Sequence, residues 1–180
     1  MNKRGVGVEQ VFIFIVVAIT FGLIVIFGYN AIADFLVKGK QVEFVQFKTD
    51  LEAAVKRLST EYGSVRVEEF YLPADYRQIC FVDMDYPPSP DEQEQLCQND
   101  QLACQVWKQA QQAPEEQEEG KPGSAGVDEN VFLKPAALVP IKVSLIHLGS
   151  PGFLCQKISD GRFTLRLEGK GSYTQVGRAE

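Results

Sequence analysis

The sequence predicts an α+β fold in which one long N-terminal helix, transmembrane and then amphipathic, packs on a mainly antiparallel β-sheet head. Three observations predict it. Residues 11–29 form an uncharged apolar run, residues 41–62 repeat their apolar side chains with a helical period, and short alternating apolar segments follow from residue 65 onward. A chain of 180 residues therefore provides one membrane-inserting helix and one domain of ordinary size.

The apolar run reads VFIFIVVAITFGLIVIFGY, and fourteen of its nineteen residues are Val, Ile, Leu or Phe. A helix of this length spans a hydrocarbon core of roughly 30 Å. Lys3 and Arg4 precede the run with no acid before them, and positive residues remain on the cytoplasmic side. We therefore expect a single pass through the lipid bilayer of the cell membrane, with the N-terminus cytoplasmic and the C-terminal domain extracellular.

The next segment continues this helix with one apolar face. Residues 34–40 separate the two parts, and Gly39 is only a weak break, at about 1 kcal/mol relative to Ala. We expect residues 1–33 to form a signal or transmembrane helix, residues 34–63 its amphipathic continuation, and Gly63 to end it. The apolar side chains recur every three or four positions, at Phe44, Phe47, Leu51, Ala54, Val55, Leu58 and Tyr62.

The β-rich head is predicted over residues 64–86 and 130–180. Its clearest strand is Arg162–Glu168, in which apolar and polar side chains alternate, so that its dry face is expected to pack on the amphipathic helix. Asp160-Gly161 favours a tight hairpin that pairs this strand with the one before it. The predicted strands are Val65–Tyr71, Gln78–Met84, Ile141–Leu148, Phe153–Ile158, Arg162–Glu168 and Ser172–Val176.

Residues 87–129 are predicted to be an acidic Gln/Glu/Pro-rich insertion, partly helical and partly disordered. They contain ten acids and two bases, a local charge of −8 in a chain of net charge −6. Ser89 is placed to cap a helix that begins at Pro90 and reaches about Gln112, either unbroken or as a broken pair. The acidic run indicates solvation rather than a cation or partner site.

The four cysteines, Cys80, Cys97, Cys104 and Cys155, lie in the part expected outside the cell, where thiols are commonly oxidised. Four cysteines allow three connectivities. On one unbroken helix Cys97 and Cys104 would lie about 10 Å apart, beyond the roughly 7 Å limit for a disulfide. Asn99-Asp100 offers a break. We favour Cys97 with Cys104 and Cys80 with Cys155, and the other pairings stay open.

No catalytic, metal or cofactor site is predicted. Six residues separate Cys97 from Cys104, more than structural zinc sites use, and His147 is the only histidine. His147 shares strand parity with apolar neighbours at 141, 143 and 145, which favours a sheet-packed side chain over a catalytic base. No Gly-x-Ser-x-Gly elbow is present, and no basic stripe with aromatic residues indicates nucleic acid.

Two acidic pairs, Asp83 with Asp85 and Glu68 with Glu69, are interpreted as the wet edges of strands. An anchored hydrolase would need these carboxylates to converge in a cleft with perturbed ionisation. We therefore expect a protein that is not an enzyme.

The N-terminal segment MNKRGVGVE, directly before the apolar helix, resembles the class III signal peptide of archaeal type IV pilins and pilin-like proteins. The resemblance implies a long helix followed by a β-rich head. It also implies cleavage after Gly5 by a prepilin peptidase, Val6 as the mature N-terminus, and pairing of Glu9 with the terminal amine of another copy during assembly. Glu9 is fourth after this cut, whereas pilins place the glutamate fifth, and Val6 stands where glutamine is frequent.

The exported part, in FYLPADYRQICFVDMDYP, NVFLKP and FTLRLEGKG, is similar to archaeal membrane-anchored proteins of unknown activity. Two other fates of the N-terminus remain open. Ala31-Ile32-Ala33 before Asp34 suits signal peptidase, and an uncleaved anchor needs no motif. We expect a pilin-like structural subunit of a surface filament or adhesive structure, with a monomeric membrane-anchored binding or accessory domain as the alternative.

Overall fold

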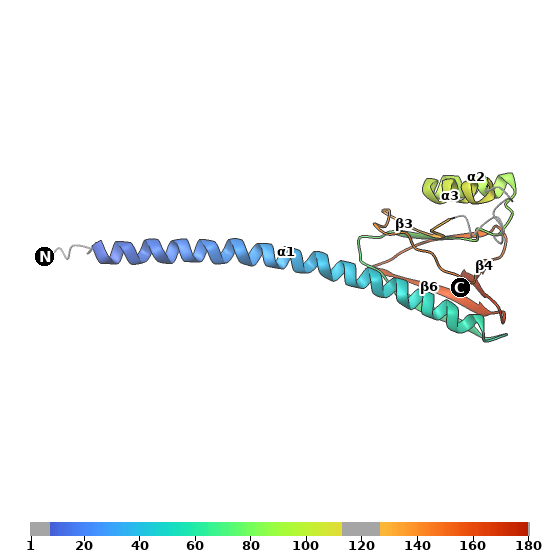
Figure 1. Ribbon diagram of the computed structural model, residues 1–180, viewed down its shortest axis with the longest axis horizontal. Coiled ribbons are helices and arrows are strands. Elements are labelled where there is room, and N and C mark those ends of the chain that lie inside the picture. The colour runs from blue at the N-terminus through green and yellow to red at the C-terminus, as the bar shows by residue number, and fades with distance from the viewer. Residues whose placement is uncertain (1–7, 113–126, 180) are drawn as a thin grey trace. The chain divides into compact units, whose positions relative to one another are not determined.

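The computed structural model describes residues 8–112 and 127–179. Its α+β class with a long N-terminal helix confirms the prediction, and Figure 1 shows the order of the elements along the chain. The chain forms two compact units, Met1–Val42 and Glu43–Glu180. We call the second the C-terminal unit.

Helix α1 runs without interruption over Val8–Ser59, so the expected continuity through residues 34–40 is present. The helix ends at Ser59, and the chain turns away through Gly63, which has a φ of +79°. Glycine adopts this left-handed backbone without the steric cost that a side chain adds. Residues 43–59 belong to the C-terminal unit and bury the predicted apolar face, with Phe47, Leu51 and Leu58 at most 2% exposed.

The first sheet has the order β1-β6-β7-β4. Its strands are β1 (Val65–Tyr71), β6 (Arg162–Gly169), β7 (Thr174–Arg178) and β4 (Ile146–Leu148). The three longer strands are antiparallel, and β4 runs parallel to β7. The alternation in β6 is as predicted, because Phe163, Leu165 and Leu167 are buried while Arg162, Thr164 and Arg166 are exposed.

A second sheet, with the order β3-β2-β5, was not expected as a separate sheet. It consists of β3 (Val131–Lys134), β2 (Gln78–Val82) and β5 (Phe153–Lys157), all antiparallel. No pattern in the sequence predicts β3 as a strand. Its first three residues are all buried, so it has no alternation, and a run of four residues is too short to show its type by periodicity.

The predicted hairpin between residues 153–158 and 162–168 is wrong, although its turn forms. Asp160 and Gly161 have φ values of +52° and +72°, and Ser159 and Arg162 make a single bridge. Beyond that bridge β5 pairs with β2 and β6 pairs with β1, in different sheets. A turn motif reverses the chain locally, whereas apolar burial decides which strand each segment pairs with.

The insertion forms two helices, α2 (Pro90–Asn99) and α3 (Gln101–Gln112), and residues 113–126, the rest of the expected excursion, lie outside the described residues. Ser89 caps α2 in a capping box, in which its side chain accepts from the Glu92 N–H while the Glu92 side chain accepts from the Ser89 N–H. The broken pair of helices is therefore the form that the insertion takes.

Two apolar cores lie on opposite faces of the second sheet. The larger core packs residues 43–59 of α1 and the inner face of the first sheet against Ile79, Phe81 and Leu133. The smaller core joins the other face to α2 and α3 through Leu96 and Trp107. Figure 1 shows α2 and α3 on one side of β3 and β6 on the other. The second sheet is thus the middle layer of the C-terminal unit.

Candidate functional site

The predicted processing residues lie at the start of the chain. Gly5 and Val6 fall outside the described residues, and Glu9 lies in the first turn of α1. Cleavage after Gly5 and pairing of Glu9 with another copy therefore stay predictions.

The apolar part of α1 covers Val11–Ile32, three residues more than the run expected from the sequence. It has 22 residues, and its most apolar stretch is not buried in the rest of the protein. Thr20 Oγ1 donates to the Val16 carbonyl oxygen at 2.8 Å, so this hydroxyl is satisfied within the helix. By length and composition the segment is a candidate single membrane span or signal anchor.

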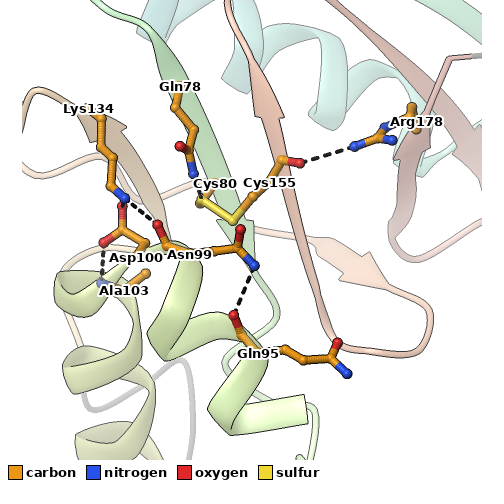
Figure 2. Close-up of a disulfide and its surroundings, with 9 residues drawn as sticks. All are labelled: Gln78, Cys80, Gln95, Asn99, Asp100, Ala103, Lys134, Cys155 and Arg178. Atoms are coloured by element: carbon orange, nitrogen blue, oxygen red, sulfur yellow. Dashed lines mark hydrogen bonds and ion pairs between the residues drawn. A yellow bond between two sulfur atoms is a disulfide. The ribbon is translucent and has the colours of Figure 1, made fainter.

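The disulfide between Cys80 and Cys155 joins two strands of the second sheet (Figure 2). The two residues lie directly opposite each other on β2 and β5, with 4.0 Å between their Cα atoms and a sequence separation of 75. Gln78 Nε2 donates to Cys80 Sγ at 3.2 Å. The Cys80–Cys155 disulfide therefore ties the early and late parts of the C-terminal unit together.

The second disulfide joins Cys97 on α2 to Cys104 on α3, with a Cα–Cα distance of 4.9 Å. The break that permits it is at Asp100, whose carboxylate accepts from the Ala103 N–H at 3.0 Å and so caps α3. These two bonds are the pairs favoured from the sequence. Within the described ranges no group of three or more His, Cys, Asp or Glu side chains is arranged to hold a metal ion.

Lys134 on β3 secures the turn between α2 and α3, as Figure 2 shows. Its ammonium group donates to the Asn99 carbonyl oxygen and lies 3.8 Å from the buried carboxylate of Asp100. One cation therefore neutralises the buried acid and satisfies a carbonyl at the end of α2.

A buried carboxylate, Asp83, follows β2 and connects the two sheets. Its side chain is 4% exposed and is surrounded by donors: the Asp85 N–H at 3.1 Å, the Leu148 N–H at 3.1 Å and His147 Nδ1 at 3.0 Å. Trp107 Nε1 donates to the Asp83 backbone carbonyl at 3.1 Å. Three partners for one carboxylate meet the requirement that a buried acid be fully hydrogen-bonded.

The prediction that His147 is packed within the sheet is wrong. Ile146 and Leu148 are the buried residues of β4, and the His147 side chain is 46% exposed. The reason is Leu145, which has a φ of +62°, so that residues 141–145 do not continue β4 as a strand and the predicted parity is lost. His147 therefore faces solvent with one ring nitrogen held by Asp83.

His147 and Tyr173 stand between two clefts. Their rings meet edge to face with centroids 4.5 Å apart, and both rings line both clefts together with Asp83 and Asp85. One cleft, of about 380 Å³, is completed by equal numbers of polar and apolar residues: Asn130, Lys142, Ser144 and Ser172, and Met84, Val143, Leu145 and Ile146. The other, of about 370 Å³, is completed by Tyr86, Pro87, Leu148, Gly149 and Gln175.

The hydrogen bonds of His147 determine what its ring offers to these two clefts. His147 Nδ1 lies 3.0 Å from a carboxylate oxygen of Asp83, so in the neutral ring the tautomer with the proton on Nδ1 is favoured, and Nε2 is then an acceptor. Among the hydrogen bonds of the described residues, none joins His147 to a serine, threonine or cysteine, as a nucleophile-activating pair would require. Glu68 and Glu69 line a different cleft beside α1, so the two acidic pairs do not converge.

From the sequence, Asp83 was paired only with Asp85, and its contact with His147 was not predicted. The two residues are 64 positions apart, and no spacing rule connects them. The available signal was a carboxylate directly after the buried strand segment ICFV, where an acid needs partners from elsewhere in the fold.

Glu92 forms a second polar cluster beside the second cleft. Its carboxylate accepts from the Ser89 N–H at 2.8 Å, the Tyr86 hydroxyl at 3.1 Å and the Ser150 hydroxyl at 3.0 Å. The hydrogen bond from the Ser89 backbone is the main reason that the pKa of Glu92 is below its ordinary value, with the two hydroxyls adding to the effect. Glu92 therefore connects α2 to the loop that carries Ser150.

Three features of the described residues bear on function: the exposed apolar helix, the two disulfides, and the clefts on either side of His147 and Tyr173. Comparisons with known protein families, with known proteins and with solved structures gave no match.

Proposed function

We propose that the chain is an exported, membrane-anchored structural protein, a pilin-like subunit of a surface filament or adhesive structure. The observation that carries the proposal is the Val11–Ile32 segment, an apolar helix of 22 residues without burial in its most apolar stretch. Exposed apolar surface of this extent needs lipid or other helices to cover it. Lys3 and Arg4 ahead of it favour export of everything that follows.

The two disulfides support an exported C-terminal unit. All four cysteines are paired, and disulfides persist in oxidising compartments outside the cytoplasm. This agrees with the orientation derived from the flanking charges.

Assembly would transfer the apolar helices from the bilayer into a bundle of copies. Gly22 and Gly28 have open space where a side chain would begin, which lets neighbouring helices approach closely. Glu9 would pair with the terminal amine of another copy, because a carboxylate at the edge of an apolar helix is costly without a partner.

The experiment that tests the proposal is determination of the N-terminal residue of the protein purified from cells that have a prepilin peptidase. We expect Val6. Gly5→Leu should leave the uncleaved precursor, because the peptidase acts after Gly5, and the matched Gly7→Leu variant should still be processed. A mature N-terminus at Asp34, or retention of Met1 or Asn2, contradicts the proposal.

The clefts beside His147 favour a second candidate, a monomeric membrane-anchored binding or accessory domain. Rings, amides, hydroxyls and one carboxylate-oriented histidine converge there, as they do in sites for small polar ligands. Under this candidate the N-terminus stays at Met1 or Asn2 and the chain does not polymerise, so the same determination separates the two.

A further inference from the structure

Strand β1 has an open hydrogen-bonding edge. It is the first strand of the β1-β6-β7-β4 sheet and pairs only with β6 within that sheet. At its two ends Ser64 O accepts from Gly169 N and Leu72 N donates to Gly161 O, so the even-numbered residues bond to β6. Because antiparallel bonding alternates along a strand, the outward backbone groups are those of Val65, Val67, Glu69 and Tyr71.

The four residues whose backbone groups point outward are accessible, and three of them are apolar. Val65, Val67 and Tyr71 are 48%, 63% and 56% exposed. Edge strands are commonly protected by lysine, proline or a bulge. Strand β1 has no lysine or proline, and of its three charged residues, Arg66, Glu68 and Glu69, only Glu69 is among the four. No backbone hydrogen bond from another described segment reaches these four residues. The edge is therefore free to accept an added strand.

We propose that β1 pairs with β1 of a second copy, antiparallel, about a two-fold axis through Val67. In such a pair the outward, odd-numbered residues of one copy lie opposite the odd-numbered residues of the other. An axis through Val67 places Arg66 of each copy opposite Glu68 of the other. An axis through Arg66, Glu68 or Glu69 would instead place that residue opposite the same residue of the second copy. Like charges directly opposite destabilise a sheet.

A hollow beside the edge receives the arginine of the second copy. It measures about 300 Å³ and lies between α1 and β1, where its charged lining is Asp50, Arg57, Glu68 and Glu69. Three carboxylates against one guanidinium favour an added cation. Arg66 now pairs with Glu61 at 3.3 Å, with half of its side chain exposed, so exchanging that partner costs little.

The two-fold axis determines how the copies approach. Residues 43–59 of α1 run beside β1, with Arg57 bonded to Glu68 and Phe47 packed on Phe70. The axis reverses this helical segment together with β1, so the two chains enter the paired units from opposite ends. The contact therefore suits copies on facing cells or on separate filaments. It concerns the C-terminal unit alone and does not depend on how the N-terminus is processed.

The first test is disulfide cross-linking of the full chain in detergent. All four native cysteines are paired, so Val67→Cys adds one thiol at the axis. We expect a several-fold larger covalent dimer fraction on a non-reducing gel than for Thr164→Cys. Thr164 is the matched control because it lies on the same exposed sheet face but on β6, one strand away from the edge. Equal dimer fractions in the two variants overturn the proposal.

The second test separates the strand contact from association through the apolar helix. Val67→Pro removes an outward N–H and leaves the β1–β6 ladder intact, whereas Val67→Thr keeps the edge. In sedimentation we expect loss of the association with Val67→Pro and its retention with Val67→Thr, together with weakening at high salt. If Val67→Pro associates as the parent does, the β1 contact is refuted, and the N-terminal determination still decides the filament proposal independently.

Discussion

At the scale of single residues, Glu92 shows how one carboxylate couples a helix start to a distant loop. It completes the capping box with Ser89 and also binds the hydroxyls of Tyr86 and Ser150. These bonds favour the charged form, so its pKa lies below the ordinary value of 4.5. A carboxylate with a lowered pKa contributes stability above its unfolded pKa and loses it as the pH falls through the folded value.

We therefore expect Glu92→Gln to flatten the acid limb of the stability curve. The parent should lose stability as the pH falls below about 4.5, and the variant should lose less over that range while being less stable at pH 7. Urea midpoints of the full chain in detergent, measured from pH 3 to pH 7, check this. Glu94→Gln, an exposed change on the same helix, is the control. Identical acid limbs for Glu92→Gln and the parent would show that the cluster does not contribute.

Single residues also mark where the sequence could not predict the site. The Asp83–His147 pair and the Tyr173 ring meet only after two sheets have packed, and no local pattern encodes that meeting. The left-handed backbone at Leu145 removes the strand parity from which the orientation of His147 was predicted. The side chains of the site were visible in the sequence, but their partners depend on long-range topology.

At the scale of elements, local signals predicted what is locally determined. Helix α1 follows from its apolar run and its repeat of three and four, and the cap of α2 follows from Ser89 and Pro90. The Asp160-Gly161 turn forms, yet its flanking strands join different sheets. Strand β3 depends on pairing with β2 rather than on its own composition. Which strands pair is decided by the packing of the whole C-terminal unit, and for this reason the strand pairing was predicted wrongly.

The two disulfides should contribute unequally. By the loop-entropy relation the Cys80–Cys155 bond, with a sequence separation of 75, contributes about 4 kcal/mol, and the Cys97–Cys104 bond, with a separation of 7, about 2–3 kcal/mol. The double variant C80A/C155A should therefore unfold at a lower urea concentration than C97A/C104A. Chemical denaturation of both variants in the full chain checks the order, and the reverse order would contradict it.

At the scale of the whole molecule, the two cores of the C-terminal unit share the second sheet. Ile79 and Phe81 face the larger core from β2, and Cys80 and Val82 face the smaller core from the same strand. If the packing on one face of β2 is lost, the strand moves and the packing on its other face is lost with it. The two cores are therefore expected to unfold together.

Leu165→Ala tests this, with the single tryptophan as reporter. Leu165 is fully buried in the larger core, and Trp107 is fully buried in the smaller one. The substitution should lower the free energy of unfolding by about 2–5 kcal/mol. Trp107 fluorescence should report the full shift of the transition. An unshifted fluorescence transition would mean that the cores melt separately.

The buried hydroxyl of Thr174 donates to the Val55 carbonyl oxygen at 2.7 Å, which joins β7 directly to the helix, while β1 continues from that helix and pairs with β6 along seven residues. Tension applied through α1 is therefore borne by β1, β6 and β7 in shear, the geometry in which many hydrogen bonds must break at once. The Cys80–Cys155 disulfide lies in the other sheet, which is not among the strands that bear this tension. Reducing it would therefore destabilise the C-terminal unit but leave the strands that connect it to α1 paired.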